Sequence, residues 1–326
     1  MLHMQRRRWI PHDVFALAVL SALLGTATIS SAAAGKKLAY EQHMNVIYGD
    51  GDGVALVMDV FTPTGPKNGI GIIDVASGAW HSDRGKIRDH MLARVYDIFC
   101  GKGYTVFAVR PGSISRFSIP DMVKHIRMAT KWVQDHSAEY GIDPHNLGIT
   151  GGSAGGHLSA LVVVSTPADK DGKVDQPFKA VGVFFPPTDF IRYRGRATDF
   201  GKDERSAQFI RSLTADRGDP SDRALDAAKL TELARKISPA LLVDRKQPPF
   251  LIIHGDADFT VPLHQSEMLV AALKKNGGSA ELIVKKGGGH PWFTIAEEVK
   301  VMADWFDKEL KPKQTPGGQA ENTKHE

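Results

Sequence analysis

Short apolar runs alternate with longer amphipathic segments along most of this chain, and this alternation limits the choice of fold more than any other property. Apolar runs of strand length occupy residues 70–76, 105–109, 147–150, 181–185, 250–254 and 281–284. Helical spacing of apolar residues marks 86–99, 121–140, 155–166, 263–276 and 294–310. Alternating strands and helices predict an α/β class fold, with a mainly parallel sheet covered by helices on both faces.

Residues 46–61 read as two strands around the turn Gly49-Asp50-Gly51-Asp52-Gly53. The Asp-Gly repeat is similar to a calcium-binding loop, but the later acidic positions that such a loop needs are missing. We therefore expect a hairpin that pairs antiparallel at one edge of the sheet.

A polar, charge-rich segment at 188–237 interrupts the alternation after a strand. We expect it to be largely helical, and either a small cap over a site or a structural buttress. The tail 311–326 lacks periodicity and is rich in Pro and Gly, which predicts disorder. Residues 35–310 are then expected to form one domain.

The N-terminus has the organisation of a secretory signal peptide. Arg6-Arg7-Arg8 form a positive region, 14–24 is apolar, and small residues at 30–35 offer a cleavage site after Ala34. The apolar run is short for a membrane span of about 20 residues. We expect residues 1–34 to be removed and the mature protein to be periplasmic or secreted, with no stable membrane association. Arg6–Ile10 also loosely resembles a twin-arginine export signal.

Charge and cysteine content exclude some classes of function. The formal charge is +4, of which Arg6–Arg8 and Asp13 contribute two charges within the leader. No basic stripe with interleaved aromatic residues follows, so nucleic-acid binding is not expected. Cys100 is the sole cysteine, which rules out an intrachain disulfide and favours a small buried apolar residue.

The motif Gly151-Gly152-Ser153-Ala154-Gly155 lies between a predicted strand and a predicted helix. A nucleophilic serine needs such a sharp turn to lift its Oγ clear of the sheet, and flanking glycines relieve the crowding. A dinucleotide-binding loop would normally follow the first strand, and no Tyr-x-x-x-Lys pair accompanies this motif. A purely structural glycine turn is the other alternative, but further members of a catalytic triad follow in the sequence.

Two carboxylates follow the buried strand at 250–254, in His254-Gly255-Asp256-Ala257-Asp258. A triad acid must be held by its loop and directed at an imidazole N–H. We predict Asp258 for this role and expect Asp256 to bind loop amides or to cap the turn. His254, Asp256 and Asp258 could also be imagined as metal ligands, but the spacing alone is weak support. No metal or cofactor is therefore expected.

The third candidate is His290, in a glycine-rich loop between the last predicted strand and the last helix. A general base that must reach over the sheet to Ser153 is plausible on such a loop. The order Ser153, Asp258, His290 is that of the α/β-hydrolase fold. His157 and His264 lie within predicted helices, and no role is assigned to them.

Three motifs together resemble bacterial α/β-hydrolase esterases of the feruloyl- and acetyl-esterase-like group, related to the hormone-sensitive-lipase-like carboxylesterases. They are Thr150-Gly-Gly-Ser-Ala-Gly-Gly-His157-Leu158, His254-Gly-Asp-Ala-Asp258 and Gly-Gly-His290, and the similarity covers about 46–310. The resemblance implies an α/β-hydrolase fold with a small helical insertion. It also implies a serine carboxylesterase acting on short-acyl or aryl esters, with acetyl or feruloyl groups on polysaccharide as one substrate class.

The chain departs from this family at the loop that completes the oxyanion hole. The family carries His-Gly-Gly-Gly-Trp, whereas this chain has Ala76-Ser77-Gly78-Ala79-Trp80. Backbone amides can still donate there, so we expect the N–H of Ala154 and that of Gly78 or Ala79 to form the hole. Trp80 and Trp292 are expected to border the substrate pocket.

Two other functions stay open at this point. An amidase or peptidase of the same fold could use the same triad, and a hydrolase-fold protein could bind a ligand without turnover. The acyl and alcohol specificity and the oligomeric state are also left open by the sequence.

Overall fold

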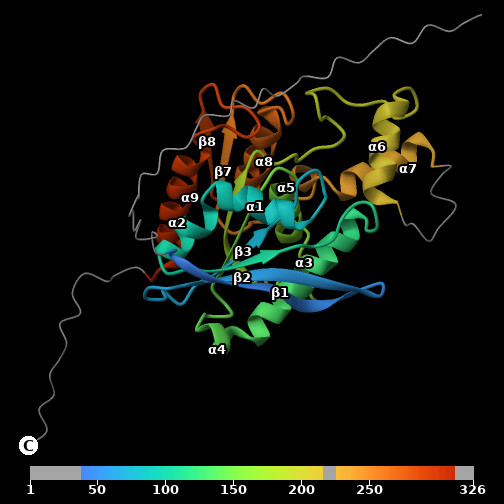
Figure 1. Ribbon diagram of the computed structural model, residues 1–326. Coiled ribbons are helices and arrows are strands. Elements are labelled where there is room, and N and C mark those ends of the chain that lie inside the picture. The colour runs from blue at the N-terminus through green and yellow to red at the C-terminus, as the bar shows by residue number, and fades with distance from the viewer. Residues whose placement is uncertain (1–37, 216–224, 313–326) are drawn as a thin grey trace, which may run out of the picture. The chain divides into compact units, whose positions relative to one another are not determined.

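Eight strands form one sheet within residues 38–215 and 225–312, which the computed structural model describes (Figure 1). They are β1 (Tyr40–Gly51), β2 (Val54–Pro63), β3 (Gly71–Val75), β4 (Thr105–Val109), β5 (Leu147–Gly152), β6 (Phe178–Phe184), β7 (Phe250–Gly255) and β8 (Ala280–Lys285). Their order in the sheet is β1-β2-β4-β3-β5-β6-β7-β8. β2 pairs antiparallel with β1 and β4, and every other neighbouring pair is parallel. The predicted mainly parallel sheet is confirmed.

The hairpin predicted at the sheet edge is also present. Asp52 and Gly53 turn the chain with φ of 48° and 75°, as a two-residue primed turn requires. The Asp50 carboxylate accepts a hydrogen bond from the Gly53 N–H. β1 begins at Tyr40, earlier than predicted, because much of this edge strand is exposed and carries no apolar pattern.

Helices cover both faces of the sheet and create two separate cores. On one face lie α2 (Val95–Gly101) and α9 (Ile295–Leu310); on the other lie α3 (Ile119–Asp135), α5 (Ala154–Val164) and α8 (His264–Lys275) (Figure 1). β4 shows how the strands supply both cores, since Phe107 and Val109 face one and Val106 and Ala108 face the other.

Two of the predicted helices are interrupted. The segment 86–99 divides into α1 (Arg84–Leu92) and α2 because Arg94 takes a left-handed conformation with φ of 61°. The segment 121–140 divides into α3 and α4 (Ser137–Tyr140) at His136, whose ring stacks on Trp132 and whose Nδ1 bonds the Trp132 carbonyl. Apolar spacing continues through both breaks, so periodicity alone does not reveal them.

The insertion between β6 and β7 is helical only in part. It contains α6 (Glu204–Thr214) and α7 (Ala227–Lys236), begun by the N-cap residues Asp203 and Asp226, and is followed by the short 3₁₀ helix η2 (Pro239–Leu241). Residues 188–203 form turns rather than helix. The predicted leader and all but two residues of the predicted disordered tail lie outside the described residues. No helix among those described is long and apolar enough to cross a bilayer.

Candidate active site

Ser153 occupies the sharp turn between β5 and α5 with φ of 53° and ψ of −120°, a conformation that non-glycine residues rarely adopt. Its N–H donates to the Phe184 carbonyl and its own carbonyl accepts from the His157 N–H, so the turn is held from both sides. The turn places Ser153 at the N-terminus of α5, where the helix dipole favours negative charge.

The glycines around Ser153 are required by space. A Cβ on Gly155 would lie 2.2 Å from the Val75 carbonyl oxygen, and one on Gly151 would lie 2.6 Å from the Gly155 backbone. Gly152 differs, because its Cβ would meet the Phe185 ring and the Phe184 Cβ at ordinary contact distances of 3.5 Å or more. The two outer glycines of the motif therefore let α5 approach β3 and β5 closely.

The three residues singled out in the sequence meet at this turn. His290 Nε2 lies 2.9 Å from Ser153 Oγ, and His290 Nδ1 lies 2.6 Å from Asp258 Oδ2. A hydrogen-bonded chain thus joins a hydroxyl, an imidazole and a buried carboxylate that lie far apart in the sequence. Such a chain can accept a proton from the hydroxyl and stabilise the imidazolium that forms.

Several donors hold the Asp258 carboxylate in place. Its Oδ1 accepts from the backbone N–H groups of Thr260 and Val261, both at 2.9 Å. His254, fully buried, brings its Nε2 within 3.4 Å of Oδ2. Burial raises the Asp258 pKa, but hydrogen bonds from His254 and His290 outweigh this effect and hold the pKa well below its usual range. Asp258 is therefore a carboxylate at neutral pH.

The loop that carries His290 is tied to the loop that carries Asp258. Asp256 Oδ1 accepts from the Gly287 N–H at 2.6 Å, and the Ala257 N–H donates to the Gly288 carbonyl at 3.0 Å. The expectation that Asp256 binds loop amides is confirmed. Phe185 also packs edge-on against the His290 ring, with ring centroids 4.4 Å apart. Neither Phe185 nor His254 carried a sequence signal for this role.

The loop expected to complete an oxyanion hole folds into a tight turn. Gly78 and His81 exchange both backbone hydrogen bonds, and Ala79 and Trp80 between them have φ of 47° and 57°. The Gly78 N–H is therefore already used, and the expectation that it could be a donor is corrected. Within the described residues, the N–H groups of Ala79 and Ala154 donate to no protein acceptor and are the remaining candidates.

Trp80 is fixed by a buried histidine that the sequence left without a role. Its indole N–H donates to His157 Nδ1 at 3.1 Å, and His157 Nε2 donates to the Ile237 carbonyl at 2.7 Å. An indole N–H can only donate, so Nδ1 is unprotonated and the imidazole is neutral. Burial lowers the pKa of His157 to about 4. This chain connects the tight turn to α5 and to the end of α7.

Trp292 lies behind the ring that packs on the catalytic candidate His290. It is buried, its indole N–H donates to Glu298 Oε2 at 2.7 Å, and its ring packs against Phe184 and Phe185. Trp292 therefore supports Phe185, which in turn contacts His290, and its expected place at the border of the substrate pocket stays a prediction.

The residues considered as metal ligands in the sequence make hydrogen bonds within the protein instead. His254 bonds Ser266 and the Val261 carbonyl, and Asp256 binds the Gly287 amide, so they do not converge on a metal position with Asp258. No cluster of three or more His, Cys, Asp or Glu side chains suited to a metal occurs in 38–215 or 225–312. Cys100 is buried as expected, and burial raises the pKa of its thiol to about 12.

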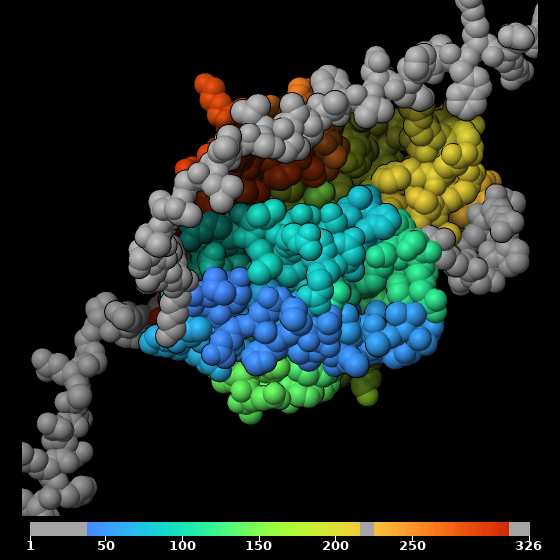
Figure 2. All heavy atoms as spheres, viewed as in Figure 1, coloured from blue at the N-terminus to red at the C-terminus, as the bar shows by residue number. Residues whose placement is uncertain are grey.

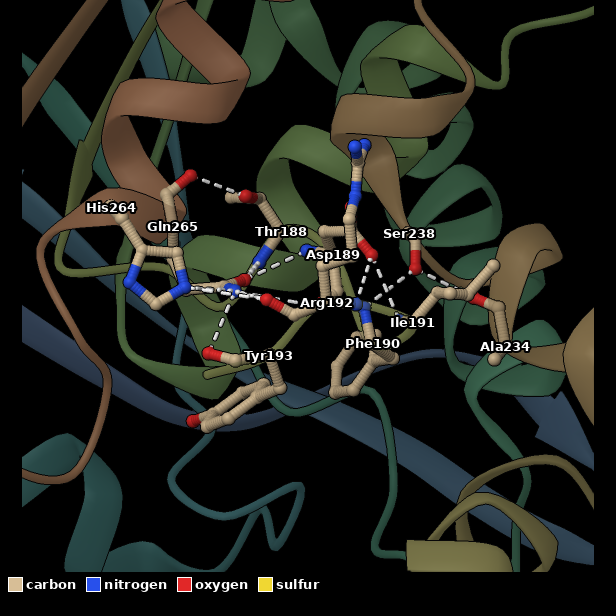
Figure 3. A network of polar contacts seen from close by, with 10 residues as sticks. All are labelled: Thr188, Asp189, Phe190, Ile191, Arg192, Tyr193, Ala234, Ser238, His264 and Gln265. Carbon is tan, nitrogen blue, oxygen red and sulfur yellow. Dashed lines mark hydrogen bonds and ion pairs between the residues drawn. The ribbon is translucent and has the colours of Figure 1, made fainter. Parts of the chain in front are cut away.

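A buried polar network fixes the start of the insertion beside this site (Figure 3). The Gln265 side-chain oxygen accepts from the N–H groups of Thr188 and Asp189 at 2.7 and 2.8 Å, and its Nε2 donates to the Tyr193 carbonyl. Ser238 Oγ accepts from the Phe190 N–H. Sequence analysis gave no indication of this network, because Gln265 lies about 75 residues from its partners.

Curated relatives of this chain are named esterases. The chain is 26% identical over 234 residues to the esterase LipQ of Mycobacterium tuberculosis, covering 70% of this chain and 51% of LipQ. It is 27% identical to LipC of the same organism over 77% of this chain and 60% of LipC. The chain thus spans about half the length of the curated relatives that it matches first.

Solved structures match over a larger share of both chains. A truncated carbohydrate esterase from gut microbiota has a TM-score of 0.68 and 26% identity, covering 85% of this chain and 99% of the other. The propionate-bound Est2 esterase of Thermogutta terrifontis has a TM-score of 0.61 and 25% identity, with 84% and 97% covered. The expected α/β-hydrolase fold is therefore confirmed. The BD-FAE family model matches residues 58–273, which include Ser153 and Asp258. The chain belongs to the BD-FAE family.

Proposed function

We propose that this protein is a serine carboxylesterase that hydrolyses short-acyl esters through an acyl-enzyme. The observation that carries the proposal is the unbroken hydrogen-bonded chain from Ser153 Oγ through His290 to Asp258. Support also comes from the esterase names of the relatives and from the propionate-bound state of one similar structure.

In the first half of the reaction, Ser153 Oγ attacks the ester carbonyl while its proton passes to His290 Nε2. Asp258 accepts the Nδ1–H of the resulting imidazolium and keeps the ring oriented. The N–H groups of Ala154 and Ala79 bind the oxyanion of the tetrahedral intermediate. One such donor lowers the barrier by about 3 kcal/mol in comparable sites.

His290 then returns the proton to the alcohol as the tetrahedral intermediate collapses, which leaves the acyl-serine. In the second half, His290 takes a proton from water, the hydroxide attacks the acyl-serine, and the oxyanion forms again at the same two amides. His290 gives this proton to Ser153 Oγ as the second intermediate collapses and the acid is released. Oxygen and hydrogen balance with one water consumed per ester, and no cofactor is required by these steps.

The test is hydrolysis of p-nitrophenyl acetate, butyrate and octanoate by the parent protein and by Ser153→Ala. We expect activity that falls as the acyl chain lengthens and that is lost in the variant. Activity undiminished in Ser153→Ala would contradict the assignment of the nucleophile. An absence of hydrolysis in folded parent protein would contradict the esterase itself.

The natural ester is proposed to be an acetyl or feruloyl group on polysaccharide, in line with the family and with the name of the similar carbohydrate esterase. Export of the chain would bring it to such a substrate. Intact-mass analysis of protein recovered from an expressing bacterium should give a chain that begins at Gly35; a chain that retains residues 1–34 would contradict export with cleavage.

A further inference from the structure

A cleft of about 740 Å³ opens along α6 and the preceding segment of the insertion. Four aromatic residues line it, and Phe209 among them is 41% exposed; they are Phe190, Tyr193, Phe200 and Phe209. In Figure 2 the yellow atoms of this insertion gather at one side of the visible face. Neither Ser153 nor His290 lines the cleft, so it is separate from the place where the ester bond would be broken.

The cleft nevertheless adjoins the site on two sides. The Trp80 ring, which follows the Ala79 amide, contacts Phe190 and Phe209 with centroid distances of 5.9 and 5.8 Å. The Tyr193 hydroxyl donates to the Thr260 carbonyl, in the loop whose amides hold Asp258. The Trp80 side chain therefore connects the tight turn, to which it belongs, directly with the cleft wall.

The cleft has an excess of positive charge that its own acids do not neutralise. Of its two carboxylates, Asp199 pairs with Lys202 at 3.5 Å, and Asp203 accepts from Ser206 at the start of α6 and also attracts the nearby charge of Arg205. Four cationic side chains against these two carboxylates still leave an excess of positive charge. The other cationic lining residues are exposed, and within the described residues their side chains make no ion pair or hydrogen bond. They are Arg194, Arg196 and Arg205.

One wall of the cleft is built before any ligand arrives. Phe190 and Tyr193 belong to the segment that Gln265 and Ser238 fix through buried hydrogen bonds (Figure 3). Asp189 continues this network, since its carboxylate accepts from the N–H groups of Ile191 and Arg192. A wall that is already ordered avoids much of the entropy loss of binding.

We propose that this cleft binds a carboxylate-bearing sugar ring of the ester substrate, so that the enzyme prefers esters carried on acidic carbohydrate. The proposal rests on the esterase function proposed above. Guanidinium groups match the two oxygens of a carboxylate, and the aromatic walls offer apolar surface to the ring. The cleft is open and cationic, which suits a hydrated anionic sugar better than a long acyl chain.

The first test is binding without turnover, in the full-length Ser153→Ala protein. Calorimetry would compare tetragalacturonate with xylotetraose, a neutral oligosaccharide of the same length. We expect the acidic tetramer to bind at least roughly tenfold more tightly and to lose most of this advantage in about 0.5 M NaCl, because exposed charges are screened. Equal affinity for both tetramers would overturn the proposal.

Arginine variants test whether the preference for tetragalacturonate comes from this cleft. Removing one exposed charge pair changes affinity by roughly two- to fivefold, so Arg194→Gln with Arg196→Gln should weaken tetragalacturonate binding by roughly tenfold. Arg235→Gln is the matched control, since Arg235 is exposed on α7 and does not line the cleft. Unchanged binding in the double variant, or an equal loss in Arg235→Gln, would contradict the site.

A turnover comparison separates this proposal from the esterase proposal. With Ser153 present, the ratio of kcat/KM for acetylated galacturonate oligomers to that for acetylated xylan oligomers should be high and should fall in the double variant. Hydrolysis of p-nitrophenyl acetate without any preference between the oligomers would contradict the acidic-sugar site alone. Selective binding of tetragalacturonate without hydrolysis of any ester would contradict the esterase and support the site.

Discussion

The Trp80 indole donates a hydrogen bond to His157 Nδ1 although the two residues lie 77 positions apart. This bond orients the residue that follows Ala79, one of the two candidate oxyanion donors. Trp80→Phe keeps a six-membered aromatic ring and removes the five-membered ring that carries the donor. We expect kcat to fall roughly tenfold, corresponding to about 1–1.5 kcal/mol, with a smaller change in KM.

Tyr104→Phe is the control for this experiment, because it also removes one hydrogen bond of a buried aromatic side chain, that to Asp307 on α9. Steady-state kinetics should show a clearly larger effect on kcat in Trp80→Phe. Equal kinetic effects in the two variants would mean that the Trp80 bond contributes only to folding.

The neutral state of His157 has a consequence for stability against acid. Burial depresses its folded pKa to about 4, below the ordinary value of 6.5 in the unfolded chain. The unfolded state therefore binds more protons between these values. The contribution of the neutral His157 ring to the unfolding free energy is complete above pH 6.5. It is lost as the pH falls toward 4. At pH 5 the loss from this group is about 2 kcal/mol relative to pH 7.5.

Urea unfolding at pH 7.5 and pH 5 would measure this effect in the parent and in His157→Gln. The difference in unfolding free energy between the two pH values should be smaller in the variant by about 2 kcal/mol. The same difference in both proteins would show that His157 does not titrate as proposed. Asp258 changes the unfolding free energy only at lower pH than this, because its folded pKa is depressed below the ordinary carboxyl value and it stays ionised at pH 5.

Two glycines of the serine motif should respond differently to the same substitution. Gly155→Ala would bring Cβ to 2.2 Å from the Val75 carbonyl, so we expect a loss of several kcal/mol in unfolding free energy, on the order of 3, or no folded protein. Gly152→Ala meets its nearest neighbour at 3.5 Å and should remain folded with a melting temperature near that of the parent. Similar stability in both variants would refute this account of the motif.

Two buried serines provide a comparable pair. Among residues 38–215 and 225–312, Ser77 Oγ has no hydrogen-bond partner, whereas Ser159 Oγ is within bonding distance of the Thr150 and Gly155 carbonyls. Replacing an unpartnered buried hydroxyl with a methyl group is neutral or favourable. Ser77→Ala should therefore raise the unfolding free energy by up to about 1 kcal/mol, while Ser159→Ala should lower it by about 1 kcal/mol. Chemical denaturation would measure the unfolding free energies of the two variants. A Ser77→Ala protein less stable than Ser159→Ala would contradict this expectation.

Asp258 and Asp256 lie in one loop but should have different roles: Asp258 orients His290, whereas Asp256 holds the loop through the Gly287 amide. Asp258→Asn removes the charge that faces His290 Nδ1 and can present an amide N–H instead. We expect kcat to fall by roughly 10³- to 10⁴-fold. Asp256→Asn keeps an oxygen for the Gly287 amide and should retain most of the activity. A larger loss in Asp256→Asn would transfer the role of triad acid to that residue.

Sequence patterns predicted the strands well because buried parallel strands consist largely of apolar residues, as β4 does after Thr105 and β3 does apart from Asp74. They also predicted which hydroxyl, carboxylate and imidazole meet, since each follows a strand at the same edge of the sheet. The breaks at Arg94 and His136 were missed because apolar spacing continues across them.

Contacts between distant segments were not predictable either. The Gly78 amide is engaged by a turn whose left-handed residues, Ala79 and Trp80, are not types that favour this conformation. The bond from Trp80 to His157 and the position of Phe185 against His290 depend on how separate segments pack. No local pattern encodes these distances.

The bonds from Gly287 to Asp256 and from Ala257 to Gly288 join two loops into one unit. Acid and base should consequently move together, and the distance that varies during thermal motion should be that between His290 and Ser153. Hydrogen exchange would then report the amides of Ala257 and Gly287 opening in a single cooperative event. The glycine-rich loop would thus act as a rigid carrier of the imidazole rather than as a flexible tether.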